Sequence, residues 1–477
     1  MSRRLLCAAL AALLTTPAAF AADHASLTIY HADNDGLFSG NARDTVNAGH
    51  ALVREYRQVD LVAGNHELLI DGLPASADPE TMAVGFDPAS GVKVLGQQLR
   101  IAHPLADAIG QPVDIVTSDG NRLHGTLLGW AQDTGAMLRT DDGKVHFVRT
   151  YASMTLPSGS IIDSGILRMN VDAQSPGKRD AHLTYMTGGL GWRAAYSATL
   201  AGGSTCRMQF KPEASIANRS GRDYDNAKIK LVAGQPNLGN AGVRMYSMAK
   251  GPAPMAAAAM PEQASLGDYR SYTLPGAVDL PKATVTLTPL YSTQTLDCQR
   301  EYVIEDGGSG FPPKPNTNDY GAQDYKDRAI TSTLAFSAPD ALPAGTLRAW
   351  TIDRDGAPAL LGQAGVADTP KGQRVSVQLG ESFDLRASRE RTAFHVDANA
   401  HTMTESYKIT LTNGGDAAHT VAVREHPNRW REWTVASSSI KPSKQTPQLL
   451  EFHVPVPANG DVTLTYTVKY TWLAQDL

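Results

Sequence analysis

The stretch AHLTYMTGGLGWRAAYSATLAGGSTCRMQFKPEASIANRSGRDYDNAKIKLVAG, residues 181–234, decides the fold class of this chain. An alternation of period two places every second residue on one face of a β-strand. One such face carries Trp192, Ala194, Tyr196 and Ala198. Residues 206–211 alternate in the same way, and segment 218–223 predicts a turn because Asn and Gly tolerate positive φ. The stretch therefore predicts four β-strands separated by turns.

Trp192 and Arg193 have two interpretations. An exposed pair could serve as a stacking platform for a sugar ring. Large aromatic side chains usually anchor a core, however, and a neighbouring Arg on the opposite strand face is usually solvated. We therefore predict a core Trp beside a solvated Arg.

The composition is that of a globular protein with many turns. The 477 residues are 42% hydrophobic and 19% charged, and they include 42 Gly and 28 Pro. This length predicts about two to four domains. The formal net charge of −5, without a basic block, argues against nucleic acid or anionic lipid as a partner.

The first 21 residues have the three parts of a secretory signal peptide. Arg3 and Arg4 supply positive charge, residues 5–14 form an apolar core, and residues 19–21 (Ala-Phe-Ala) form a cleavage site. The apolar run is too short for a comfortable transmembrane helix, and no other run is long enough. We expect an exported protein, periplasmic or extracellular, without an integral membrane span.

Short strands separated by Asp-Gly turns fill residues 110–157, and such turns are a strong hairpin signal. Four or five strands in about fifty residues are typical of a small SH3-like or Sm-like barrel. His124 and His146 lie in these predicted strands without partner ligands at fixed spacing. We interpret both as surface or hydrogen-bonded histidines.

The clearest alternation lies at the C-terminus. One face of the last predicted strand carries Val462, Leu464, Tyr466, Val468, Tyr470 and Trp472. A predicted hairpin at 406–424, with a turn beginning at Asn413, repeats the strand–Asn–turn–Asp–strand layout of residues 216–231. Strands at this spacing, with Gly, Asn and Pro turns, are typical of an immunoglobulin-like sandwich.

These patterns predict a mainly β chain, with several sandwich units and a small barrel inserted in its N-terminal part. The predicted parts are a signal peptide (1–21), an N-terminal β-strand region (22–105), a small SH3-like barrel (106–157), a central β-sandwich domain (158–375) with flexible loops at 243–268 and 306–327, and a C-terminal immunoglobulin-like sandwich (376–477).

Motifs for metals, cofactors and nucleophiles fail on inspection. Residues 33–36 (DNDG) begin like a calcium loop, but Leu37 stands where an oxygen ligand is required. His66 and Glu67 begin a zinc motif, but Ile70 replaces its second His. The Met residues of 243–268 are irregularly spaced, which favours a mobile loop over a copper(I) site. We predict no catalytic residue, no metal and no cofactor.

Five segments carry a resemblance to a known bacterial family. They are GLGWRAAYSATL, NRSGRDYDNAKIKLVAG, LPAGTLRAW, TPKGQRVSVQLGESFDL and VPVPANGDVTLTYTVKYTW. In this order they resemble the domain-of-unknown-function 4139 (DUF4139) family, which is related to mucoidy-inhibitor-A-like proteins. Some members carry a long coiled-coil arm, and here the predicted small barrel stands in its place. The resemblance implies no active site.

Three functions remain open. The first is an exported, non-catalytic interaction or scaffolding module of the cell envelope, whose partner is an unknown envelope protein or polysaccharide. The second is a secreted hydrolase of polysaccharide or peptide, with paired carboxylates from distant positions. The third is a carbohydrate-binding protein that uses Trp430 and Trp433 in the segment RWREW, for which a strand edge is the alternative interpretation.

The mature chain contains two cysteines, Cys206 and Cys298. Export would place them in an oxidising compartment, where paired thiols tend to form a disulfide. Cys206 shares a strand face with Met208 and Phe210, and Cys298 shares one with Leu296. We predict a bridge between them across the central sandwich, and the alternative is two separate buried thiols.

Overall fold

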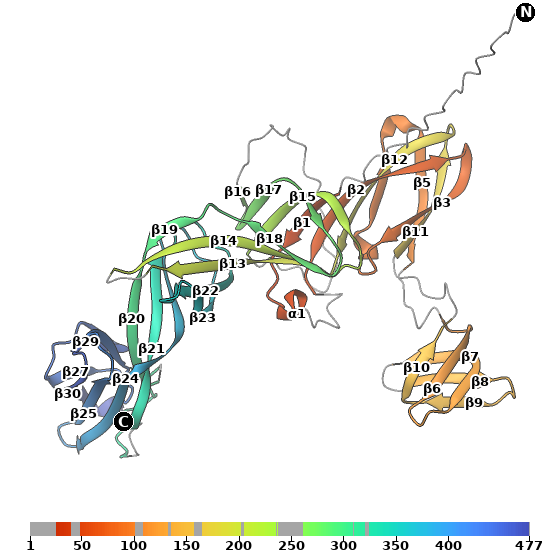
Figure 1. Cartoon of the computed structure of the whole chain (residues 1–477). Helices are drawn as coiled ribbons and strands as arrows, with labels where there is room; N and C mark the ends of the chain where they lie inside the picture. The colour runs from red at the N-terminus through yellow and green to blue at the C-terminus, as the bar shows by residue number, and fades with distance from the viewer. Residues whose placement is uncertain are drawn as a thin grey trace, which may run out of the picture.

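The computed structural model describes residues 25–39, 48–100, 108–131, 135–156, 165–201, 205–234, 236, 261–308, 310–319 and 324–476. In these residues the fold is mainly β, with five sheets, which confirms the predicted fold class (Figure 1). The helical elements are α1 (Asp35–Phe38) and three 3₁₀ turns, Pro79–Thr81, Pro88–Ser90 and Ala474–Asp476. No helix among the described residues is long and apolar enough to cross a membrane. The predicted signal peptide lies outside them.

Two sheets form the N-terminal part of the molecule. The seven-stranded sheet has the order β16 (Glu262–Leu266), β17 (Tyr269–Leu280), β15 (Tyr224–Ala233), β1 (Ser26–Tyr30), β2 (Ala51–Leu61), β12 (Gly177–Thr187), β4 (Ala83–Phe86). The three-stranded sheet has the order β3 (Gly64–Leu73), β11 (Gly165–Ala173), β5 (Val92–Arg100). β1 pairs in parallel with β15 and antiparallel with β2, so the first strand lies inside its sheet.

A separate five-stranded antiparallel sheet corresponds to the predicted small barrel. Its order is β10 (Tyr151–Thr155), β6 (Pro112–Thr117), β7 (Arg122–Ala131), β8 (Gly135–Thr140), β9 (Val145–Val148). It lies apart from the other sheets (Figure 1). It has its own small core, which includes Ile115, Leu127 and Leu138. Within the described residues β9 pairs only with β8, and β10 only with β6. The unit is therefore an open sheet and not a closed barrel.

The stretch at 181–234 builds the central sandwich. The six-stranded sheet contains β18 (Thr284–Pro289), β14 (Arg207–Asn218), β13 (Leu190–Leu200), β22 (Gly345–Ile352) and β23 (Pro358–Val366), and β19 (Gln294–Asp297) also pairs with β14. Trp192 is fully buried and donates its indole N–H to the Val232 carbonyl at 2.9 Å. The predicted core Trp is thereby confirmed. Phe210 of this sheet meets Phe336 of the facing layer, with ring centroids 5.4 Å apart.

The facing layer belongs to a nine-stranded sheet that curls around the C-terminal core. Its order is β27 (Trp433–Ser438), β30 (Gly460–Thr471), β25 (Thr402–Asn413), β24 (Arg374–Asp397), β21 (Tyr325–Ser337), β20 (Gln299–Asp306), β26 (His419–Glu425), β29 (Leu449–Val456), β28 (Lys444–Thr446). β24 places Val375 and Val377 in the central core and Leu385 and Ala387 in the C-terminal core. Long strands therefore connect the two cores directly.

The two hairpins that share a sequence layout also share a turn structure. The Asn218 side chain donates to the carbonyls of Arg222 and Leu280, each at 2.8 Å. Asn413 donates in the same way to the carbonyls of Ala417 and Pro457, at 2.8 and 2.9 Å. Each Asn therefore ties its own turn to a neighbouring strand.

The segment 306–327, predicted to be a flexible loop, includes the last residue of β20 and the first three of β21, and residues 310–319 contact the C-terminal unit. Asn316 donates its backbone N–H to the Arg429 carbonyl at 3.0 Å, and the Arg429 guanidinium donates back to the Asn316 carbonyl. These bonds join residues 310–319 to the C-terminal unit, and their flexibility remains a prediction. Of the other predicted loop, 243–268, residues 262–266 form β16 and residues 243–260 lie outside the described residues.

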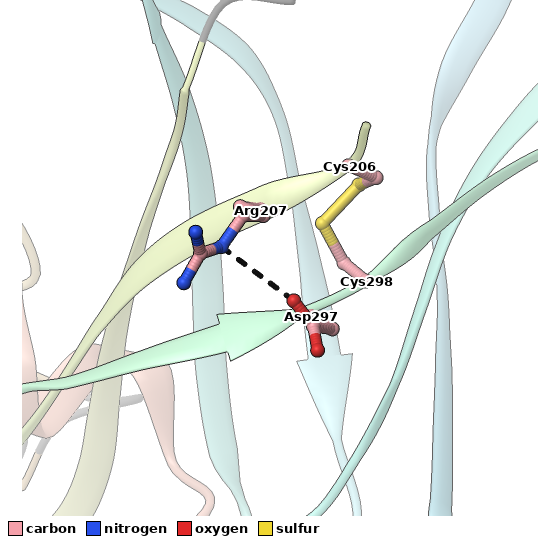
Figure 2. Close-up of a disulfide and its surroundings, with 4 residues drawn as sticks. All are labelled: Cys206, Arg207, Asp297 and Cys298. Carbon is pink, nitrogen blue, oxygen red and sulfur yellow. Dashed lines mark ion pairs between the residues drawn. A yellow bond between two sulfur atoms is a disulfide. The ribbon is translucent and has the colours of Figure 1, made fainter. Parts of the chain in front are cut away.

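The predicted disulfide between Cys206 and Cys298 is present (Figure 2). Their Cα atoms are 5.0 Å apart, and Cys298 donates its backbone N–H to the Cys206 carbonyl at 2.9 Å. Cys298 stands between β19 of the six-stranded sheet and β20 of the nine-stranded sheet. Beside the bridge, Arg207 and Asp297 form an ion pair at 3.6 Å. The disulfide therefore fixes the point at which the chain changes sheets.

Removal of the disulfide should destabilise the protein strongly, because the bridge joins residues 92 positions apart. We expect the variant Cys206→Ser/Cys298→Ser to lose about 2–5 kcal/mol of unfolding free energy. Chemical denaturation of the oxidised protein and of this variant measures the difference. A variant that keeps the oxidised protein's denaturation midpoint contradicts the prediction.

Candidate functional site

A group of buried charged side chains lies at one end of the C-terminal core. Its members are Arg389 of β24, Glu405 of β25, Glu425 of β26 and Arg429, and each is at most 7% exposed. They line a cavity of about 100 Å³ together with Tyr407, Tyr466 and Tyr470. Alternate residues of a strand share one face. Arg389 therefore lies on the same buried face as Leu385 and Ala387. Glu425 likewise shares a buried face with Val421 and Val423.

Arg389 and Glu425 form the first ion pair of this cavity. The Arg389 Nη2 lies 2.8 Å and its Nε 3.1 Å from the Glu425 carboxylate oxygens, which is a bidentate contact. Tyr466 donates its hydroxyl to Glu425 Oε2 at 2.7 Å. The guanidinium also stacks over the Tyr407 ring, 4.0 Å from the centroid. Burial raises the pKa of Glu425, while the contacts with Arg389 and Tyr466 act against this rise.

Glu405 and Arg429 form the second ion pair. The Arg429 Nε lies 2.5 Å from Glu405 Oε1, and its Nη1 donates to the carbonyls of Asn316 and Asn318. Arg391 approaches the same Glu405 oxygen at 3.4 Å. Arg429 thus links the segment 310–319 to the wall of the cavity.

In this cavity arginine side chains pair with both carboxylates, and the remaining volume is small for a substrate. Both Glu405 and Glu425 are held by arginine, whereas a nucleophile or general base needs an accessible lone pair. Binding pockets for small molecules usually measure about 300–1,000 Å³. Among the described residues, no group of three or more His, Cys, Asp or Glu side chains could hold a metal ion. The chemistry that the site supports is the burial and neutralisation of charge.

A second site in the N-terminal part repeats the arrangement of the first pair. Glu55 of β2 is 1% exposed and lies 2.7 Å from Arg222 Nη2. Its carboxylate accepts a hydrogen bond from the Tyr185 hydroxyl at 2.9 Å. Arg222 also packs over the Tyr224 ring, 5.2 Å from its centroid. Burial opposes ionisation of Glu55, but Arg222, Arg57 and Tyr185 together hold its pKa below the usual value.

Trp430 and Trp433 lie in the C-terminal core. They are 1% and 9% exposed, and Trp433 donates its indole N–H to the Pro447 carbonyl at 2.8 Å. A sugar ring stacks on an exposed aromatic face, so their burial contradicts the surface-binding interpretation. The predicted cysteine pair stabilises the central sandwich and does not line the charged cavity.

The sequence predictions did not include Arg389, Glu405 or Glu425. A signal was present: in the observed strands, each occupies an inward position among apolar residues, as Glu405 does between Met403 and Ile409. A charged residue on an apolar strand face predicts a buried ion pair. The strand pattern does not identify the ion-pair partner of Arg389, because Glu425 lies 36 positions away in the sequence.

A match to one protein family relates this chain to known proteins. The family model described as "Domain of unknown function (DUF4139)" matches residues 181–472. This range includes the central sandwich strands from β13 onward, the disulfide and the charged cavity. The comparison with curated proteins gives no match.

Removal of one partner of the first ion pair should destabilise the C-terminal core. Glu425→Gln removes the charge of the bidentate contact and leaves Arg389 with the Asp306 carboxylate, 3.2 Å from its Nη1, so we expect a loss of about 3 kcal/mol of unfolding free energy. Glu390→Gln, one residue after Arg389 and exposed, is the matched control and should change stability by less than about 0.5 kcal/mol. Equal denaturation midpoints for the two variants contradict this role.

The depressed pKa of Glu55 predicts an acid-sensitive contribution to stability. Its ionised form is favoured by folding, so the contribution is complete above the usual value of 4.5 and disappears as pH falls through the folded-state pKa. We expect the difference in unfolding free energy between wild type and Glu55→Gln to be constant near neutral pH and to shrink below about pH 4.5. Denaturation curves from pH 7 to 3 measure it, and a difference that grows on acidification contradicts the prediction.

Proposed function

This chain belongs to the DUF4139 family, and we propose that it is an exported, non-catalytic interaction or scaffolding module of the cell envelope. The partner we propose is an envelope protein or a polysaccharide.

The recurrence of one Arg–Glu–Tyr arrangement carries this proposal. Glu425 and Glu55 each meet an Arg and a Tyr hydroxyl, in different parts of the molecule. A catalytic site keeps a general base or nucleophile available to its substrate. The arrangement occurs twice, and an arginine neutralises the carboxylate each time. Both therefore act as structural ion pairs that fix the order of the strands.

The separate sheets support an interaction role. The central and C-terminal cores are connected by long strands, while the five-stranded sheet has its own core and lies apart from the other sheets (Figure 1). Such a molecule presents several strand edges and surfaces, which is how scaffolding modules contact more than one partner.

Export rests on the sequence of residues 1–21. The mature protein should begin at Ala22 or Asp23 after removal of the signal peptide. N-terminal sequencing of protein purified from the native host measures this. An intact Met1 on soluble protein from the cell interior contradicts export.

The interaction role is tested by affinity capture. Purified mature protein, immobilised and exposed to solubilised envelope, should retain a reproducible set of proteins or glycans identified by mass spectrometry. Incubation with envelope polysaccharides and peptides should release no products. Hydrolysis that Glu405→Gln and Glu425→Gln both abolish, in variants that remain folded, overturns the non-catalytic assignment.

A further inference from the structure

The outer edge of the five-stranded sheet combines unpaired backbone with exposed apolar side chains. In the described residues β9 pairs on one side only, with β8. Phe147 is 76% and Val145 45% exposed, although the strand is only four residues long. An edge strand with exposed hydrophobic residues is a template for pairing with another strand.

The face beside this edge is apolar and positively charged. Strand register places Met137 opposite Phe147 and Arg139 opposite Val145, so these four side chains share the outward face. Arg149, also exposed, directly follows β9. Within the described part of the chain no ion pair is recorded for Arg139 or Arg149, whereas the nearby Lys144 is paired with Asp142 at 2.6 Å. The uncompensated charge of this face is therefore positive.

We propose that β9 binds an extended, acidic and apolar segment of a partner protein as an added antiparallel strand. Backbone hydrogen bonds would provide the pairing, and alternate side chains would provide the specificity. Apolar side chains of the partner pack on Phe147 and Val145, and its carboxylates meet Arg139 and Arg149. The proposal rests on the interaction role proposed above and assigns a site to it.

The charge along this edge is uneven. The Lys144 end of β9 also carries Asp141 and Asp142, with Lys144 paired to Asp142 at 2.6 Å, whereas Arg149 follows the other end. A partner strand therefore gains favourable contacts where its carboxylates reach the two arginines, Arg139 and Arg149.

Binding of a defined peptide to the mature protein tests the proposal. The probe is a fluorescent eight-residue peptide in which every second residue, on one strand face, is alternately Val and Glu and the remaining residues are Thr, and its matched control carries Lys in place of Glu. Fluorescence anisotropy should show binding of the Glu peptide and about tenfold weaker or no binding of the Lys peptide. Hydrogen exchange should show new protection of the backbone amides of residues 145–148.

Variants locate the site on the molecule. Phe147→Ser should weaken binding of the Glu peptide about tenfold, and Arg139→Glu/Arg149→Glu should shift the preference to the Lys peptide. Phe383→Ser is the matched control, because Phe383 is 86% exposed on β24 and should not affect binding. Since all of these side chains are exposed, thermal denaturation should show that every variant is folded.

Four results overturn the proposal. They are equal binding of the Glu and Lys peptides, an equal loss in Phe383→Ser and Phe147→Ser, self-association of the mature protein that Phe147→Ser abolishes, and tighter binding of a single-stranded oligonucleotide than of the Glu peptide. If Phe147→Ser captures the same envelope partners as wild type, the interaction role stands and β9 is not the site.

Discussion

The antiparallel pairing of β21 with β24 is the interaction on which the arrangement of the two larger cores depends. β21 places Leu334 and Phe336 in the central core and Ile330 in the C-terminal core, and β24 likewise contributes to both. A one-residue slip of this pairing would turn apolar side chains of both cores toward solvent. The disulfide at Cys298 lies where β20, the neighbour of β21, begins, so the covalent link and the ladder fix the same junction.

Buried charge adds a second constraint. The bidentate contact of Arg389 forms only if β24 and β26 lie on facing sides of the curled sheet, because Glu425 is carried by β26. Asp306 at the end of β20 supplies a second carboxylate, 3.2 Å from Arg389 Nη1. Arg222, just before β15, requires β2 on the other side of β1 in the same way, through Glu55. Buried ion pairs contribute little net stability, but a misplaced partner leaves an unpaired charge at high cost. Their effect in this protein is to disfavour alternative strand orders.

Period-two alternation was sufficient to predict the strands around Trp192 and the last strand at Val462 to Thr471, because each is buried on one face. The Cys206–Cys298 bridge was also predictable, since only two of the three cysteines lie outside the predicted signal peptide. The pairing of Arg389 with Glu425 was not, because it depends on how distant strands are ordered in space. Trp430 was misjudged for a related reason: alternation with charged residues does not reveal that neighbouring segments cover a side chain.

The position of β1 has a consequence for the order of events during biosynthesis. Ser26 of β1 lies opposite Lys228 of β15, so the first strand remains without its parallel neighbour until about 200 further residues have been made. Non-local pairing of this kind slows folding, and it leaves strand edges open in the incomplete chain. The N-terminal sheet is therefore completed late despite the early synthesis of its first strand, and until then the open edge of β1 is a template for aggregation.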